Sequence, residues 1–160
     1  MKKTAIFLII LFISAAAFAL SKVPAPNKSG DFTLKDLSGQ TVPLHSYNGK
    51  VVLLVFFQVG CPVCQDEMPQ IEPIYKKYKS KDFDVLAIDL RESAEMVRLF
   101  ASENKLSYEI LLDEKGSAGA AYKVKFIPRI FILDRSGAIQ FESYYVQAGE
   151  LEREVKKALR

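Results

Sequence analysis

Residues 51–64 read VVLLVFFQVGCPVC and decide the fold of the chain. The first seven of them, residues 51–57, are all apolar, which is typical of a strand buried on both faces at the centre of a sheet. The stretch ends with the chain's two cysteines, Cys61 and Cys64. We therefore expect a central strand that leads at its carboxyl end into a cysteine pair, where α/β folds place their active sites.

The flanking sequence alternates between strand and helix patterns. Helices are predicted over residues 62–80, 93–104 and 150–160, with a weak, glycine-interrupted helix in residues 113–122. Strands are predicted at residues 83–89, 108–112, 130–133 and 138–145, and a hairpin at residues 32–37 and 40–44. Pro69 and Pro73 lie inside the first helix and predict a kink or a break there. This order predicts an α/β domain with a mixed central β-sheet flanked by helices and an N-terminal β-hairpin extension.

Length and composition exclude several classes of protein. A chain of 160 residues suits one domain, and 49% hydrophobic residues with 26% charged residues exclude a disordered chain. The net charge of +3 is small and the basic residues are not clustered, so we expect no nucleic-acid partner. Two cysteines and one histidine, His45, are too few for a structural metal site. We expect neither a metal nor a cofactor.

The N-terminus has the layout of a secretory signal peptide. Two lysines precede an apolar run at residues 6–13, and Ala17-Phe18-Ala19 forms an A-x-A cleavage signal. We assign residues 1–19 to this leader, residues 20–30 to a linker rich in Pro, Ser and Lys, and residues 31–160 to the domain. The alternative is an uncleaved leader that anchors the protein to the membrane. Either way, we expect an extracytoplasmic, periplasmic protein in an oxidising compartment.

The spacing of Cys61 and Cys64 suits redox chemistry. At the start of a helix, residues i and i+3 lie on one face, so the two sulfurs can bond. The helix N-terminus stabilises a thiolate on the first cysteine, and Pro62 suits the first helical position. We therefore expect Cys61 to be the attacking thiol and Cys64 to act second.

Other uses of a cysteine pair fit this sequence less well. An inert disulfide would close a loop too short to constrain the unfolded chain. A zinc site would need more ligands than this chain offers, and covalent haem attachment would need histidine where the chain has Gln65. A redox role therefore explains the pair best.

From residue 31 to about residue 160, the chain resembles the thioredoxin-like superfamily, and within it the exported TlpA/ResA-type thiol-disulfide oxidoreductases. The resemblance rests on VVLLVFF and CPVC, and on CQDEMP at residues 64–69, FDVLAID at 83–89, EILLDEKG at 109–116 and YKVKFIPRIFILDRSG at 122–137. It implies a thioredoxin-like fold and dithiol-disulfide exchange.

The resemblance also implies roles for three further residues. It places a cis peptide bond before Pro128, facing the cysteines, so that the backbone of Ile127 can pair with a substrate peptide while the proline ring keeps metals from the thiols. Glu67 matches a buried acid of this subfamily, which could move protons during exchange. Without the resemblance, Pro128 would be an ordinary turn proline and Glu67 a surface acid.

Three positions depart from the family pattern. Gly60 stands where the family usually has Trp, Val55 where thioredoxins carry a buried Asp, and Arg129 where Thr commonly follows the proline. These departures bear on the substrate surface and the redox potential, and they leave the dithiol chemistry intact.

We expect a monomeric enzyme that reduces disulfides of extracytoplasmic protein substrates, which by the resemblance include apocytochrome c. A membrane thiol donor would reduce it again, and the oxidising direction stays open. A peroxiredoxin-like peroxidase is one alternative, although QVGCPVC lacks the threonine expected before a peroxidatic cysteine. A copper chaperone or other non-enzymatic partner-binding module is another, although wider cysteine spacing and a later histidine would be expected.

Overall fold

The structure, a computed structural model, describes residues 30–160. The leader predicted at residues 1–19 and all but the last residue of the predicted linker lie outside these described residues. Within them, no helix is long and apolar enough to cross a membrane.

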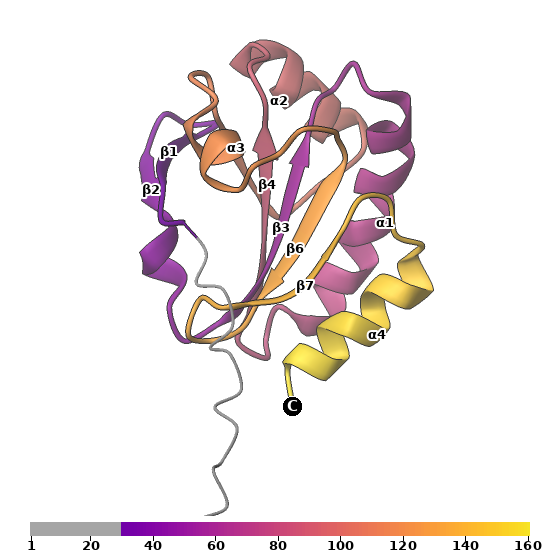
Figure 1. The fold of residues 1–160 in the computed structure, drawn as a ribbon. Helices are drawn as coiled ribbons and strands as arrows, with labels where there is room; N and C mark the ends of the chain where they lie inside the picture. The colour runs from indigo at the N-terminus through magenta and orange to yellow at the C-terminus, as the bar shows by residue number, and fades with distance from the viewer. Residues whose placement is uncertain (1–29) are drawn as a thin grey trace, which may run out of the picture.

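The described chain forms a seven-stranded mixed sheet in the order β2-β1-β5-β4-β3-β6-β7 (Figure 1). The strands are β1 Thr33–Asp36, β2 Thr41–Pro43, β3 Val51–Phe57, β4 Phe83–Asp89, β5 Glu109–Leu112, β6 Arg129–Leu133 and β7 Ile139–Ser143. In the centre, β3, β4 and β5 run parallel, whereas β6 pairs antiparallel with β3, β7 with β6, and β1 with both β2 and β5. The predicted α/β class and mixed sheet are therefore confirmed, with the β1–β2 hairpin at one edge.

Helices cover both faces of this sheet. They are α1 Pro62–Tyr78, α2 Ala94–Glu103, α3 Ser117–Ala121 and α4 Ala148–Ala158, with a 3-10 turn, η1 Leu44–Tyr47, after β2. All residues of β3 are buried. Val51, Leu53, Val55 and Phe57 pack with α1, α2 and α4, and the alternate residues pack with α3, η1 and β1. Figure 1 shows α1 and α4 on one side of the sheet and α3 on the other.

The break predicted at the two internal prolines is wrong, because α1 is assigned as one helix from Pro62 to Tyr78. Each proline removes one backbone hydrogen bond, but the apolar face of the helix is buried against the sheet through Met68, Ile71 and Ile74. Tertiary packing of this kind supplies most of the stability of a protein helix and outweighs the local cost.

Most other elements lie where the sequence predicts them. The bounds of β3 and β4 are confirmed to the residue, and the remaining ends agree or differ by up to four positions. Ser93 caps α2, since its hydroxyl accepts the backbone N–H of Met96 at 3.3 Å.

Candidate active site

The CPVC sequence lies where β3 gives way to α1. Cys61 is the N-cap residue of α1, with extended backbone, and Pro62 occupies the first helical turn. The chain before β6 passes the same end of the sheet, at the top of Figure 1, because Arg129 pairs with Phe56 near the end of β3. The peptide bond between Ile127 and Pro128 is cis, as the resemblance implied. The fold therefore brings both sequence motifs to one end of the sheet, at the carboxyl end of β3.

The two cysteines form a disulfide and differ in exposure. Their Cα atoms lie 5.2 Å apart. Cys64 is fully buried, whereas Cys61 is partly exposed beside the exposed Val63. The Sγ of Cys61 accepts a hydrogen bond from the backbone N–H of Cys64 at 3.3 Å. A substrate sulfur can therefore approach Cys61 from solvent, and the same sulfur receives the N–H that would stabilise a thiolate.

Glu67 lies one helical turn beyond Cys64 and is buried, with only 1% of its surface exposed. Its Oε1 accepts the backbone N–H of Val146 at 2.9 Å, and its Oε2 has no hydrogen-bond partner among residues 30–160. Burial raises the pKa of Glu67 to about 7, although the hydrogen bond from Val146 acts to lower it. The surface-acid alternative is therefore wrong, and this carboxyl titrates near neutral pH.

Comparison with known proteins gives the family. The sequence profile of the AhpC/TSA family matches residues 24–142, about three-quarters of the chain. The chain belongs to the AhpC/TSA family. Among its relatives, thiol-disulfide oxidoreductase ResA of Geobacillus kaustophilus (strain HTA426) is 30% identical over 146 residues, which cover 86% of this chain and 83% of that protein. Thioredoxin-like protein YneN of Bacillus subtilis (strain 168) is 41% identical over 113 residues, which cover 69% and 65% of the two chains.

Solved structures show the same fold for this AhpC/TSA member. The solution structure of a thiol:disulfide interchange protein from Bacteroides sp. matches with a TM-score of 0.75 and 25% identity, and covers 83% of this chain and 88% of that one. The thioredoxin-like fold and the assignment as a thiol-disulfide oxidoreductase are both confirmed.

Sequence reasoning missed two acids next to the cysteine loop of this oxidoreductase. Asp89 is fully buried at the carboxyl end of β4, and Glu92 follows in the loop before α2. The carboxylate of Glu92 accepts the backbone N–H groups of Val59 and Gly60, the latter at 3.0 Å. The one signal in the sequence is that FDVLAID, an otherwise apolar strand, ends in an acid.

The surface beside Pro128 is aromatic and cationic. Phe126 is 70% exposed and Tyr144 is 49% exposed, with their ring centroids 6.3 Å apart. The guanidinium of Arg129 lies 4.6 Å from the ring centroid of Tyr144 and forms an ion pair with Glu142 at 2.7 Å. Arg129, a departure from the family pattern, therefore belongs to the aromatic surface beside Pro128.

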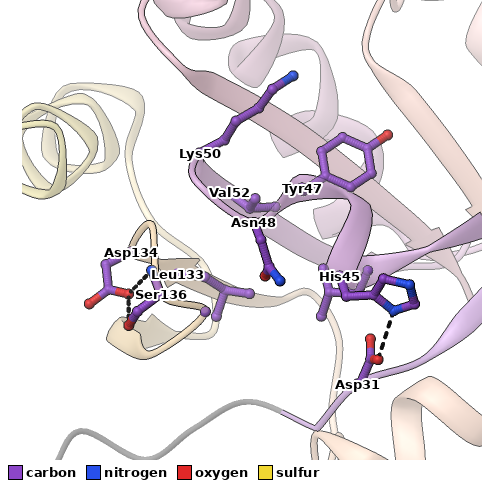
Figure 2. A pocket seen from close by; sticks show the side chains of 11 residues that line it. Asp31, His45, Tyr47, Asn48, Lys50, Val52, Leu133, Asp134 and Ser136 are labelled. Carbon is purple, nitrogen blue, oxygen red and sulfur yellow. Dashed lines mark hydrogen bonds and ion pairs between the residues drawn. The ribbon is translucent and has the colours of Figure 1, made fainter.

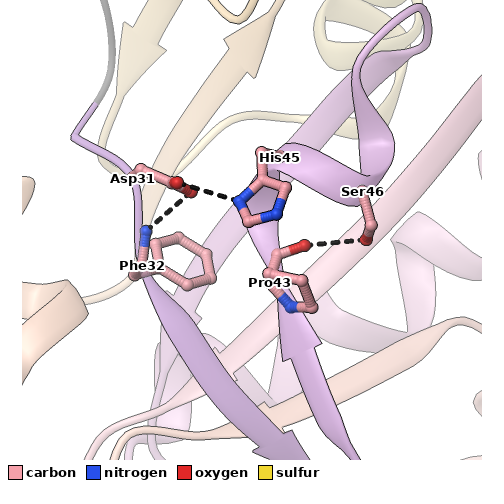
Figure 3. A network of polar contacts seen from close by, with 5 residues as sticks. All are labelled: Asp31, Phe32, Pro43, His45 and Ser46. Carbon is pink, nitrogen blue, oxygen red and sulfur yellow. Dashed lines mark hydrogen bonds and ion pairs between the residues drawn. The ribbon is translucent and has the colours of Figure 1, made fainter.

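A separate pocket of about 150 Å³ lies at the opposite end of the sheet. Figure 2 shows its lining, to which Val52 contributes from the start of β3 and Leu133 from the end of β6. At its rim, His45 Nδ1 lies 3.0 Å from the carboxylate of Asp31, which also accepts the N–H of Phe32 (Figure 3). Both side chains of this pair are mostly exposed. The pocket is remote from the cysteines and takes no part in the site.

No metal centre is evident in residues 30–160. Groups of three or more His, Cys, Asp or Glu side chains that could hold an ion are not found there.

In the reduced protein, we expect iodoacetamide near neutral pH to label Cys61 before Cys64. Cys61 is the partly exposed residue at the helix N-terminus, whereas Cys64 is buried. Mass spectrometry of the digested protein after increasing reaction times gives the order of labelling. The urea-unfolded protein is the control, in which both thiols should react at similar rates. Earlier labelling of Cys64 would contradict the assignment of roles.

Proposed function

We propose that this thiol-disulfide oxidoreductase reduces disulfide bonds of proteins outside the cytoplasm, with Cys61 as the attacking thiol and Cys64 as the resolving thiol. The observation that carries the proposal is the unequal exposure of the pair at the start of α1. A substrate disulfide can reach Cys61 and not Cys64.

The exchange proceeds in two displacement steps. The Cys61 thiolate attacks one sulfur of the substrate disulfide, forms a mixed disulfide and releases the other substrate sulfur as a thiolate. The Cys64 thiolate then attacks the Sγ of Cys61, which breaks the mixed disulfide and releases the second substrate thiol. Two electrons pass from the enzyme dithiol to the substrate, and the enzyme is left with the Cys61–Cys64 disulfide.

In this proposal, Glu67 takes the proton of the Cys64 thiol before the second step. Support comes from its burial one turn from Cys64 and from its raised pKa of about 7. A carboxyl that titrates close to the working pH can both accept and return a proton.

Ile127 and Pro128 would bind the substrate chain. Proline has no N–H, so Pro128 cannot donate a backbone hydrogen bond to a substrate chain. The backbone of Ile127, just before β6 and near the carboxyl end of β3, would pair with that chain instead. Ile127 is partly buried, and the exposed Phe126 next to it offers apolar contact to an incoming peptide. Substrate affinity would come from this surface, and the reaction from the sulfurs.

Localisation and partners complete the proposal. The leader-like residues 1–19 would direct export, residues 20–30 would serve as a linker and residues 31–160 as the domain, and an uncleaved leader would leave the enzyme anchored to the membrane. A thiol donor in the membrane would reduce the enzyme, because the outer compartment is oxidising. By family resemblance, the cysteines of apocytochrome c are among the disulfides that it would reduce, and the enzyme would act as a monomer.

The redox potential of the Cys61–Cys64 couple tests the direction of electron flow. We expect equilibration with glutathione buffers to give roughly −270 mV, a value typical of a dithiol reductant such as thioredoxin. A potential near roughly −120 mV, typical of a strong dithiol oxidant, would reverse the proposed direction. The fraction of oxidised protein can be read at each buffer ratio by alkylation and mass spectrometry.

A further inference from the structure

Three side chains hold the loop that precedes Cys61, and one of them is charged. The amide of Gln58 donates to the carbonyl of Leu90 at 2.7 Å, and the amide of Gln65 donates to the carbonyl of Val59 at 2.7 Å. Glu92 accepts two backbone N–H groups, with Oε2 toward Val59 and Oε1 toward Gly60. Its carboxylate thus binds the two residues directly before Cys61. Of these three side chains, Glu92 is the one that binds the backbone of two residues of the loop.

Asp89 holds the backbone of Glu92 itself. Its Oδ1 accepts the backbone N–H of Glu92 at 2.9 Å. Its buried Oδ2 receives no hydrogen bond from an N–H or O–H group anywhere in residues 30–160. The carboxyl of Glu92 is near enough to pair with that of Asp89, and this contact is one cause of a raised pKa at Asp89. Two adjacent carboxylates do not both stay ionised in a buried place, and a shared proton satisfies both.

We propose that Glu92 is a positioning residue that fixes the loop before Cys61, and that the proton of Asp89 keeps Glu92 in place. The proposal deepens the proposed function, since it rests on Cys61 being the attacking thiol.

The charges around Asp89 make the arrangement sensitive to alkaline pH. Burial first, and then the contact with Glu92, raise the pKa of Asp89 to about 8. Asp113 faces Asp89 from the end of β5 and adds a further negative charge. Arg91, on the same loop, is directed toward Gly116 and forms no ion pair with either acid in the described chain. Loss of the shared proton to solvent therefore leaves the carboxylates of Asp89 and Glu92 to repel each other without a compensating cation. This repulsion weakens the hydrogen bonds that Glu92 accepts from Val59 and Gly60.

Amide hydrogen exchange of the oxidised protein, read by NMR, tests the proposal without any substrate. In Glu92→Gln, one of the two N–H groups faces an amide donor, so we expect the Val59 and Gly60 amides to exchange about tenfold faster. In the wild type, their protection, corrected for intrinsic exchange, should fall above a pH of about 8. In Asp89→Asn, a neutral amide replaces the titrating carboxyl, and this fall should disappear. Glu95→Gln, which changes an exposed acid in the first turn of α2, is the matched control and should leave both amides unchanged.

A second measurement connects the loop to the thiol. The rate at which reduced Cys61 forms a mixed disulfide with a small disulfide at pH 7 should fall about tenfold in Glu92→Gln and stay unchanged in Glu95→Gln. Unchanged protection of Val59 and Gly60 in Glu92→Gln would overturn the proposal, even if Cys61 traps substrates as expected. Lost protection with an unchanged rate would overturn the positioning role. The exchange data stand whether or not the enzyme acts as a reductant, so the two proposals fail separately.

Discussion

In a Cys64→Ser variant, the mixed disulfide between Cys61 and a substrate protein should accumulate as a stable product. The attacking thiol remains in place at the N-terminus of α1, and the serine hydroxyl cannot displace a disulfide sulfur. We expect most of the reduced variant to be captured, against almost none of the wild type.

Non-reducing electrophoresis followed by mass spectrometry measures this capture. The matched control is Cys61→Ser, which keeps the buried thiol and removes the exposed one, and it should form no adduct. Equal yields from the two variants would contradict the division of roles between the cysteines. Applied to the native cell, the same variant would also recover the physiological substrate, and so test whether apocytochrome c is among the partners.

A Glu67→Gln variant should gain stability relative to the wild type as the pH rises from the ordinary pKa of the carboxyl, 4.5, through its folded-state pKa of about 7. The pKa of Glu67 is about 7 in the folded protein and ordinarily 4.5, so between these values the folded state binds more protons than the unfolded state. The unfolding free energy of the wild type therefore falls as pH rises through this window, by up to about 3 kcal/mol from this group. The amide does not titrate, so the variant escapes this loss.

Urea unfolding of the oxidised proteins between pH 4 and pH 8.5, roughly the window in which this carboxyl changes charge, measures the difference. Glu72, on the same helix, provides a control of opposite sign. Burial alone would raise the pKa of Glu72, but hydrogen bonds from Ser107 and Lys76 outweigh it and hold the pKa below its ordinary value. Glu72→Gln should therefore lose stability at neutral pH, and this loss should shrink as the wild type is acidified. A stability difference between Glu67→Gln and the wild type that does not change with pH would refute the buried-acid assignment.

The same Glu67→Gln variant tests the proton-transfer role in the reduced enzyme. If Glu67 accepts the proton of Cys64, the pH–rate profile of mixed-disulfide resolution should lose its inflection near the Glu67 pKa of about 7. A profile identical to that of the wild type would leave Glu67 without a part in the exchange.

Local sequence patterns predicted the centre of this protein well. Residues 51–57 are apolar without interruption, and such a run is stable only where both faces are covered, as β3 is. The CPVC spacing indicated redox chemistry because residues three apart lie about one helical turn apart, on the same face of a helix. In both cases, the predictive pattern lies within a few consecutive residues of the sequence.

The features that local patterns do not report depend on contacts between distant residues. Glu92, which was missed, meets the loop before Cys61 across more than thirty positions. Glu67, whose burial only the family resemblance implied, meets Val146 across 79 positions. The periodicity of a sequence does not reveal contacts between distant residues. From the sequence, Glu92 therefore looked like any other acidic residue in a loop. The break predicted at the prolines of α1 was wrong for a related reason. The sequence shows the cost of a proline to helix hydrogen bonding, but it does not show the packing of Ile71 against the sheet.

The β1–β2 hairpin has a consequence for the solubility of the folded protein. Without it, β5 would present the unpaired backbone groups of the apolar sequence EILL to solvent, an open template for association with another chain. Pairing of Lys35 with Leu112 and of Asp36 with Leu111 occupies that template. The edge strand on this side of the sheet is β2, which has only three residues and ends in Pro43. Both properties discourage the addition of a further strand. The hairpin thus protects this edge of the sheet against aggregation.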